Sequence, residues 1–404
     1  MKPSDTPFFD VVVVGGGPAG ATAAEALAKA GHSVALLDRA GRIKPCGGAI
    51  PPRLVRDFDI APELLVARIS SAQMVAPSER RVPMPIDNGY VGMVDREHFD
   101  EWLRERAAAA GATRFTGRFQ AIERDGGRTL VRFLPAARSE DGGTTGEHLI
   151  ATRLVVGADG ARSAVGRQAV PGADKVPCVF AYHEIVRAGP QAAGADYDPV
   201  RCDVYYQGHI SPDFYGWVFP HGATASIGTG SALKGYGLRP AVERLRAAAG
   251  LAGAETIRRE GAPIPMKPLK RWDNGRDVIL AGDAAGVVAP ASGEGIYYAM
   301  VSAEMVAEAA VNFLATGNAK ALAGARRAFM REHGRVFWIL GIMQRFWYRS
   351  DAQRERFVAI CRDKDVQRLT WESYMNKKLT RRDPAAHLKI FFKDLAHLFR
   401  LVSP

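Results

Sequence analysis

The feature that most constrains the fold is a glycine-rich turn near the N-terminus. The β-branched, apolar run Phe8–Val14 leads into Gly15, Gly17 and Gly20, and an alanine-rich stretch follows to Ala30. This order predicts a buried strand, a tight turn and a helix. The GxGxxG spacing alone is weak evidence, because glycine-rich turns are common and the chain has 42 glycines.

An acidic residue, Asp38, completes the pattern at the end of a second apolar run, residues 33–37. Glycines let the backbone approach a pyrophosphate at the positive N-terminus of a helix, and the carboxylate receives a ribose hydroxyl. An acid at this place disfavours the 2′-phosphate of NADP. The turn therefore predicts a site for FAD or NAD.

Composition narrows the class of protein. The 404 residues are 47% apolar and carry a net charge of +11, so the chain can bury a large core, and two domains or one composite fold are expected. Four cysteines without a CxxC pair argue against a disulfide scaffold and against a zinc site. Charges interrupt each long apolar run, and the N-terminus lacks the cleavage site of an export signal, so a cytoplasmic location is expected.

Two further turns join glycine to aspartate after a strand-like run. Residues 154–157 lead to Asp159, and residues 278–281 lead to Asp283. Either turn alone is typical of an ordinary β-turn. In this order, and with the N-terminal turn, they resemble the FAD-dependent hydroxylase superfamily of the para-hydroxybenzoate hydroxylase type.

The resemblance implies an α/β fold with α+β elements, in which a discontinuous Rossmann-like FAD-binding domain carries an inserted antiparallel-sheet substrate domain and a helical C-terminal region. The expected ranges are 1–65, 90–170 and 271–319 for the FAD domain, 66–89 and 171–270 for the substrate domain, and 320–404 for the basic C-terminal region. There is no second strand, GxGxxG and helix, so NADPH, the expected electron donor, would dock transiently beside the flavin.

The same resemblance assigns individual residues. Asp283 is expected to hold the ribityl chain, and the backbone of Gly295 and Ile296 to face the pyrimidine edge of the flavin. Arg96 is expected at the phosphates or ribityl, and backbone near Ala121 at the adenine. The full set of expected cofactor contacts is Gly15, Gly17, Ala19, Gly20, Asp38, Arg39, Cys46, Gly47, Ala49, Arg96, Ala121, Asp159, Asp283, Gly286, Gly295 and Ile296.

Two charged residues on the helix predicted over residues 95–110 stay outside this set. Glu101 and Arg104 are expected to be solvated partners on its surface.

A lone cysteine, Cys46, sits in the run Lys-Pro-Cys-Gly-Gly-Ala-Ile at residues 44–50. Proline before it and Gly47 and Gly48 after it let the backbone lie flat against a ligand. The ordinary alternative is a loop with a small buried thiol.

A row of aromatic residues forms the next pattern. Tyr215, Trp217 and Phe219 alternate along one face of a predicted strand that ends at Pro220, and a GxG follows at residues 228–230. Such a face is ordinarily sheet core. The YxWxFP and GxG pattern, together with Cys-Gly-Gly, resembles the signature of the geranylgeranyl reductase family, in the branch of chlorophyll and bacteriochlorophyll synthesis.

That resemblance, which spans nearly the whole chain, implies reduction of three isolated C=C bonds of a geranylgeranyl chain to phytyl, on (bacterio)chlorophyll or on geranylgeranyl diphosphate. An isolated alkene needs a hydride donor, an acid and a dry apolar groove. Tyr215, Trp217, Phe219 and Pro220 are expected to bind the prenyl chain. The expected acid is Cys46 or Tyr215; His183 and His209 rank behind them.

The charge excess belongs to residues 320–404, which hold 19 Lys and Arg against 8 Asp and Glu. Residues 385–402 predict a basic amphipathic helix, which would lie on a photosynthetic membrane or cap the protein's own core. No nucleic-acid recognition motif accompanies the charge. The chain would therefore be cytoplasmic or peripheral on that membrane.

Two other functions remain open at this stage. The same fold serves FAD-dependent monooxygenases and halogenases, and it resembles non-catalytic prenyl-binding carriers of the Rab escort and GDP-dissociation inhibitor type. The three intact glycine turns argue against the carrier. The oligomeric state stays open.

Overall fold

The computed structural model describes residues 6–39, 41, 43–87, 89–136, 146–192, 194 and 196–377. The chain divides into a first compact unit, residues 1–44, 96–178 and 263–337, and a second, residues 45–95, 179–262 and 338–404. The sequence-based boundaries differ, because residues 45–65 join the second unit and the C-terminal region is shared between both units. The helix predicted over 385–402 lies outside the described residues.

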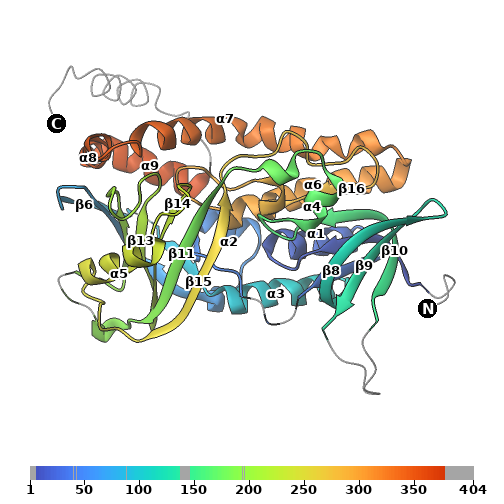
Figure 1. Ribbon diagram of the computed structural model, residues 1–404, viewed down its shortest axis with the longest axis horizontal. Coiled ribbons are helices and arrows are strands. Elements are labelled where there is room, and N and C mark those ends of the chain that lie inside the picture. The colour runs from blue at the N-terminus through green and yellow to red at the C-terminus, as the bar shows by residue number, and fades with distance from the viewer. Residues whose placement is uncertain are drawn as a thin grey trace. The chain divides into compact units, whose positions relative to one another are not determined.

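The first unit contains a six-stranded sheet in the order β1, β2, β8, β9, β10, β16, with β1 also paired to β10. All its pairings are parallel except those of β9 with β8 and β10. In Figure 1 the long strands β8, β9 and β10 lie side by side. The strands are β1 (Phe8–Val14), β2 (Val34–Asp38), β8 (Thr113–Asp125), β9 (Arg128–Pro135), β10 (His148–Gly157) and β16 (Val278–Leu280).

Helices pack on this parallel sheet, as the buried valines at residues 11–14 of β1 require. Helix α1 packs against α3 and α6. The helices of the unit are α1 (Pro18–Lys29), α3 (Arg96–Ala109), α4 (Ala164–Ala169), α6 (Ile296–Thr316) and the first part of α7 (Ala323–Trp347), with the 3-10 turn η5 at Gly282–Ala285. The expected Rossmann-like class is confirmed.

Helix α6 is long and apolar enough, by length and composition alone, to cross a membrane. Half of its apolar window is buried inside the molecule, and the helix packs on α1 and η5. These contacts are those of a core helix of the first unit.

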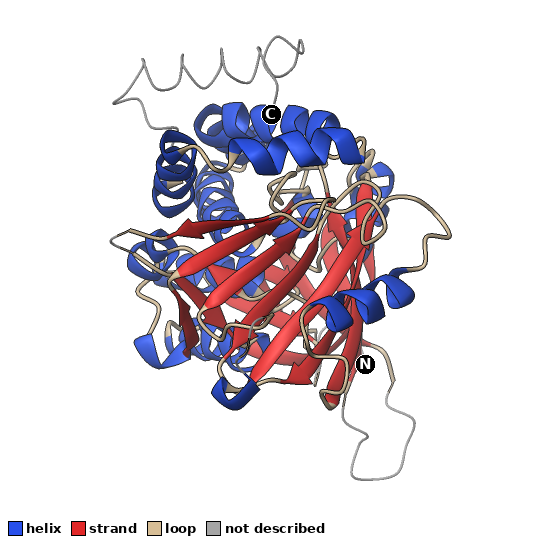
Figure 2. Cartoon of the chain, turned by 90° about the vertical axis from the view of Figure 1, so that its left-hand side faces the viewer, coloured by secondary structure: helices blue, strands red, loops and turns tan. Residues whose placement is uncertain are grey.

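The second unit is built on a seven-stranded sheet in the order β15, β11, β14, β13, β12, β5, β6 (Figure 2). The expected antiparallel arrangement holds for most of the described strand pairings, but β12 runs parallel to β5. A small sheet joins β3, β7 and β4. The strands are β3 (Ala49–Ile50), β4 (Leu65–Ile69), β5 (Ser71–Val75), β6 (Arg81–Pro85), β7 (Val91–Val94), β11 (Cys178–Arg187), β12 (Arg201–Tyr205), β13 (Gly216–His221), β14 (Thr224–Ser231) and β15 (Thr256–Pro265).

One face of the large sheet packs on α5 (Leu238–Ala248). Val218 of β13 and Ile227 of β14 meet Val242 and Leu245 of the helix in one buried cluster. Because neighbouring residues of a strand point to opposite faces, the residues beside Val218 lie on the other face. The remaining helices are α2 (Pro52–Asp57), α8 (Asp351–Ile360) and α9 (Lys364–Asn376).

Candidate functional site

The glycine turn of the first unit is tightly packed. Gly15 has φ +103°, and a Cβ on it would lie 2.5 Å from the carbonyl oxygen of Ala158. A Cβ on Gly20 would lie 1.7 Å from the carbonyl oxygen of Gly15. Any side chain at these two positions would push β1, β10 and α1 apart, so the glycines let the start of α1 sit close to the sheet.

Gly17, between them, is less crowded, because a Cβ there would make only ordinary van der Waals contacts. A Cβ there would be 3.9 Å from its nearest neighbours, side-chain atoms of Arg96 and Asp100. Those two residues form a buried pair, with Arg96 Nε and Nη2 each donating over 2.7 Å to the carboxylate of Asp100. Bare backbone at the positive start of α1, with a guanidinium beside it, forms a cradle suited to a pyrophosphate.

The carboxylate of Asp38 at the end of β2 lies beside this turn. Arg104 Nη1 donates to the carbonyl oxygen of Gly16 over 3.1 Å and to Asp38 Oδ2 over 3.3 Å. The prediction that Arg104 is merely solvated is wrong, because its side chain is only 16% exposed and ties α3 to the turn while also pairing with Glu101. Its spacing of eight residues from Arg96, two helical turns, is the signal that could have revealed it.

Asp283 lies in η5, close to the start of α6. Its side chain is 10% exposed and forms an ion pair with Lys44, and its Oδ1 lies 3.5 Å from where a Cβ of Gly295 would be. Burial, and then the negative charge of Asp283, raise the pKa of the Cys178 thiol. Ile296 begins α6 and is buried. Asp283 and the N-terminus of α6 therefore come together as the expected ribityl and pyrimidine contacts require.

Two predicted cofactor residues have evident packing roles. Asp159 Oδ2 accepts hydrogen bonds from the backbone N–H of Ala164 at 2.6 Å and of Val165 at 3.2 Å, so it caps α4. A Cβ on Gly286 would lie 2.3 Å from the carbonyl oxygen of Lys267. Both residues shape the turns; direct contact with a cofactor stays a prediction for them, as it does for exposed Arg39 and buried Ala121.

The first unit fits the ADP part and ribityl chain of FAD. The exposed backbone at Gly17 can bind the pyrophosphate. Asp38 can accept a hydrogen bond from a ribose hydroxyl, and Asp283 can accept hydrogen bonds from the ribityl hydroxyls. The described residues hold no cluster of His, Cys, Asp and Glu that could bind a metal ion.

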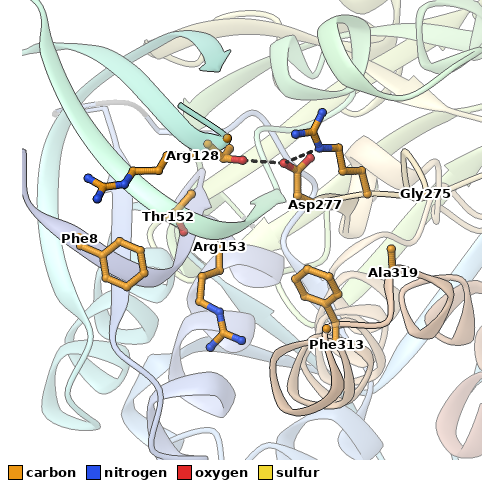
Figure 3. Close-up of a pocket in the computed structure, with 12 residues that line it drawn as sticks. Phe8, Arg128, Thr152, Arg153, Gly275, Asp277, Phe313 and Ala319 are labelled. Atoms are coloured by element: carbon orange, nitrogen blue, oxygen red, sulfur yellow. Dashed lines mark hydrogen bonds and ion pairs between the residues drawn. The ribbon is translucent and has the colours of Figure 1, made fainter. Parts of the chain in front are cut away.

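A hollow of about 440 Å³ in the same unit lies elsewhere (Figure 3). Phe8, Arg128 and Arg153 are among its lining residues. Phe8 begins β1, whereas the glycine turn follows the end of that strand. Nucleotides bind at the carboxyl ends of parallel strands, so this hollow is separate from the cofactor site.

In the second unit the Cys-Gly-Gly loop lies on strand β13. A Cβ on Gly47 would be 3.2 Å from the ring of Phe219, and a Cβ on Gly48 would be 2.5 Å from Nε2 of His221. The half-buried Cys46 accepts a hydrogen bond at its Sγ from the backbone N–H of Gly48 over 3.4 Å. The structure therefore brings Cys46 and the predicted prenyl-binding row together.

Sequence reasoning missed His221 beside this loop. Burial lowers the pKa of its imidazole, and Nδ1 lies 3.0 Å from the carbonyl oxygen of Phe219. The signal was available, because His221 continues the alternation of Tyr215, Trp217 and Phe219 on one strand face.

The aromatic row is continuous. Ring centroids are 6.1 Å apart between Tyr215 and Trp217 and 6.4 Å apart between Trp217 and Phe219. Tyr215 continues at 6.1 Å to Tyr206, which meets Phe357 of α8 at 4.9 Å. Tyr215 and Trp217 are buried.

The GxG after the row makes room for it. Trp217 pairs with Gly228 in the neighbouring strand, and a Cβ on Gly228 would lie 2.3 Å from the indole. Gly230 is equally restricted, because a Cβ there would lie 2.6 Å from Val179. The glycines of β14 thus allow the indole to lie flat over that strand.

Buried polar groups hold the indole in place. Trp217 Nε1 donates to Ser226 Oγ over 3.1 Å; that oxygen lies 2.9 Å from His183 Nδ1, and His183 Nε2 lies 3.0 Å from Glu260 Oε2. Since Ser226 accepts from the indole, its proton can go to Nδ1, which leaves an Nε2 proton for Glu260. Burial alone would raise the pKa of Glu260, but the hydrogen bond from His183 and the charge of Arg258 lower it. His183 therefore supports Trp217, whereas His209 enters the described hydrogen bonds only through its backbone carbonyl, which accepts from Tyr236 and Arg244.

Comparisons with known proteins identify the family and the fold. A model of the family "Pyridine nucleotide-disulphide oxidoreductase" matches residues 9–180, and one of the family "Lycopene cyclase protein" matches residues 229–395. A solved structure from Thermoplasma acidophilum, described as geranylgeranyl bacteriochlorophyll reductase-like, has the same fold with a TM-score of 0.80 at 21% identity, over 94% of this chain and 100% of that one.

Two relatives match almost end to end. The geranylgeranyl diphosphate reductase of Rhodobacter capsulatus is 60% identical, over 98% of this chain and 99% of that protein. The protein of the same name from Synechocystis is 39% identical, over 96% of this chain and 98% of its own length. With FAD as its cofactor, the chain belongs to the geranylgeranyl reductase family of flavin oxidoreductases.

Proposed function

We propose that this protein reduces the isolated C=C bonds of a geranylgeranyl chain to phytyl in (bacterio)chlorophyll synthesis, with NADPH as the electron donor. The observation that carries the proposal is the contact of the Cys-Gly-Gly loop with the aromatic row, at Gly47 and Phe219, in a chain that also holds a dinucleotide turn. The names of the relatives over their full length support the substrate class.

The first unit would hold FAD through the backbone at Gly17, the carboxylates of Asp38 and Asp283, and the start of α6 at Gly295. Bound FAD supplies the hydride. The protein then has to exclude water, hold the alkene and deliver one proton for each bond reduced.

In this proposal, the second unit excludes water, holds the alkene and delivers the proton. Tyr215, Trp217 and Phe219 offer apolar faces for the chain, and their π-systems can stabilise positive charge that develops at a tertiary carbon. Cys46, whose thiol lies in the loop against this row, delivers the proton, and Tyr215 is the second candidate. A row of rings with few polar anchors lets the chain slide between successive reductions.

The direct test is an anaerobic assay of the flavin-loaded protein with NADPH and a geranylgeranyl substrate, read by product mass. We expect gains of two, four and six hydrogen atoms. A product that gains oxygen when air is admitted would instead support a monooxygenase. A colourless protein that binds the prenyl chain without changing it would support a carrier.

We further propose that the protein works from the cytoplasm at the surface of the photosynthetic membrane, through helix α7. Five of its exposed residues recur every three or four positions and form one stripe, Arg331, Arg335, Trp338, Ile342 and Arg345; Arg327 and Glu332 of the helix are exposed as well. The Trp338 side chain is 68% exposed and that of Ile342 47%. An exposed tryptophan flanked by arginines suits the interface of an anionic bilayer.

This surface predicts that the full-length protein sediments with vesicles rich in phosphatidylglycerol and does so less at high salt. The double variant Trp338→Ala, Ile342→Ser should bind these vesicles at least about a hundredfold more weakly, because burial of apolar side chains contributes about 1.5–3 kcal/mol each. Trp102→Ala, which removes a half-buried tryptophan from α3, is the control. Equal binding by both variants would contradict the proposal.

A further inference from the structure

A basic hollow of about 500 Å³ lies in the second unit, between β6 and the start of α9. Its lining residues are Arg80, Arg81, Val82, Pro83, Arg362, Lys364 and Gln367. Four of these seven side chains are cationic and none is acidic. A concave site of this charge suits a ligand with several negative oxygens.

The cations differ in how far they are neutralised. Arg80 Nη2 lies 3.5 Å from Glu355, and Arg81 Nη2 lies 3.2 Å from Asp196. Arg362 and Lys364 are exposed, and among the described residues neither has a carboxylate within 4.0 Å. Lys364 Nζ instead donates to the amide oxygen of Gln367 over 3.4 Å.

The floor of the hollow is fixed by a buried amide. Gln367 Nε2 donates to the carbonyl oxygen of Pro83 over 3.0 Å and to that of Cys361 over 2.8 Å. These bonds tie α9 to β6 and place the cations of Arg362 and Lys364 on a rigid base, so less ordering entropy opposes binding there.

The same floor adjoins the aromatic row. Cys361 is buried, and its backbone N–H donates over 3.3 Å to the carbonyl oxygen of Phe357, whose ring lies 4.9 Å from that of Tyr206. Burial is the main cause that raises the pKa values of Tyr206 and Tyr348, and the nearby Cys361 thiol adds a smaller contribution to each. Tyr206 leads to Tyr215 at 6.1 Å and so to Trp217. The basic hollow therefore stands at one end of the row and the Cys-Gly-Gly loop at the other.

We propose that this hollow binds the diphosphate group of geranylgeranyl diphosphate while the prenyl chain follows the aromatic row toward Cys46. The inference rests on the proposed function and selects the free diphosphate over the pigment ester, because the ester carries no phosphate to place among Arg362 and Lys364. Arginine can bind phosphate oxygens in pairs, and lysine adds a point charge.

The test uses the flavin-loaded, full-length protein with Arg362→Gln and Lys364→Gln combined. KM for geranylgeranyl diphosphate should rise about ten- to hundredfold, as expected for loss of charge-assisted bonds, with kcat within about twofold. KM for geranylgeraniol, which lacks the charged group, should not change. Arg368→Gln is the matched control, since Arg368 lies on the same helix, pairs with Asp365 and Glu372, and does not line the hollow.

A binding measurement separates this inference from the proposed function. Inorganic pyrophosphate should bind the wild-type protein in calorimetry, compete with geranylgeranyl diphosphate, and bind the double variant at least tenfold more weakly, whether or not any alkene is reduced. Equal pyrophosphate binding by both proteins would overturn the inference. So would a double variant that loses only its binding to phosphatidylglycerol vesicles, because the hollow would then contact a lipid headgroup.

Discussion

Asp283→Ala should yield folded protein that has lost most of its FAD. The carboxylate is nearly buried in η5 beside the start of α6, where it can accept a strong hydrogen bond from a hydroxyl of the ribityl chain. A hydrogen bond to a charged group contributes about 1.5–3 kcal/mol, so FAD affinity should fall about ten- to hundredfold. The measurement is the ratio of flavin absorbance to protein absorbance after gel filtration, followed by titration with FAD.

The control for this variant is Asp174→Ala, which removes an exposed carboxylate from the same unit. Asp283→Asn should retain more flavin than Asp283→Ala, because an amide oxygen still accepts a hydrogen bond. Full FAD occupancy in Asp283→Ala would show that the ribityl chain is held elsewhere.

Trp217→Ala should keep its flavin and lose about a hundredfold in alkene turnover. The indole is the middle ring of the row and is fixed through Ser226, so its loss removes both an apolar face and the rigidity that aligns the chain. A misplacement of about 1 Å at a reacting centre can cost about a hundredfold in rate. The measurement is product formation under anaerobic conditions with flavin content held equal.

Truncation of a buried tryptophan costs about 3–5 kcal/mol of folding free energy, so a gentler variant accompanies it. Trp217→Phe keeps an aromatic face but cannot donate to Ser226, and it should retain the fold with an intermediate rate. Trp102→Ala on α3 should leave turnover unchanged. If Trp217→Ala reduces alkenes at the normal rate, the row is ordinary sheet core.

The parts of the fold that sequence alone predicts are those with a clean pattern. The apolar run at residues 8–14 matches β1, and the helix expected over 95–110 is found as Arg96–Ala109. Several strands escaped prediction, including β8 and β11 inside their sheets, and two others are β6 and β15. Both are edge strands of their sheet, and edges tolerate the prolines of Arg81–Pro85 and the charges of Thr256–Pro265, which hide the usual alternation.

The residues of the candidate site also separate into those that the sequence predicts and those that it does not. Glycine turns and the aromatic row have fixed local spacing, so residues such as Gly17 and Trp217 could be named from the sequence. Residues that come into contact only in the folded chain could not be named from the sequence. Arg104 reaches an aspartate 66 positions earlier, and His183 reaches Glu260 77 positions later. The hydrogen bonds that orient the site depend on sheet register, which no short pattern encodes.

The contact between Trp217 and Gly228 limits which substitutions these two positions tolerate, both in engineered variants and in homologues. A methyl group at position 228 would overlap the indole, with 2.3 Å between carbon atoms, so position 228 can change only together with position 217. A smaller residue at 217 would leave a hole that an alanine at 228 could fill. A redesign that places a side chain at position 228 should therefore also replace Trp217 with a smaller residue, and in homologues a non-glycine at 228 is expected to occur together with the loss of tryptophan at 217.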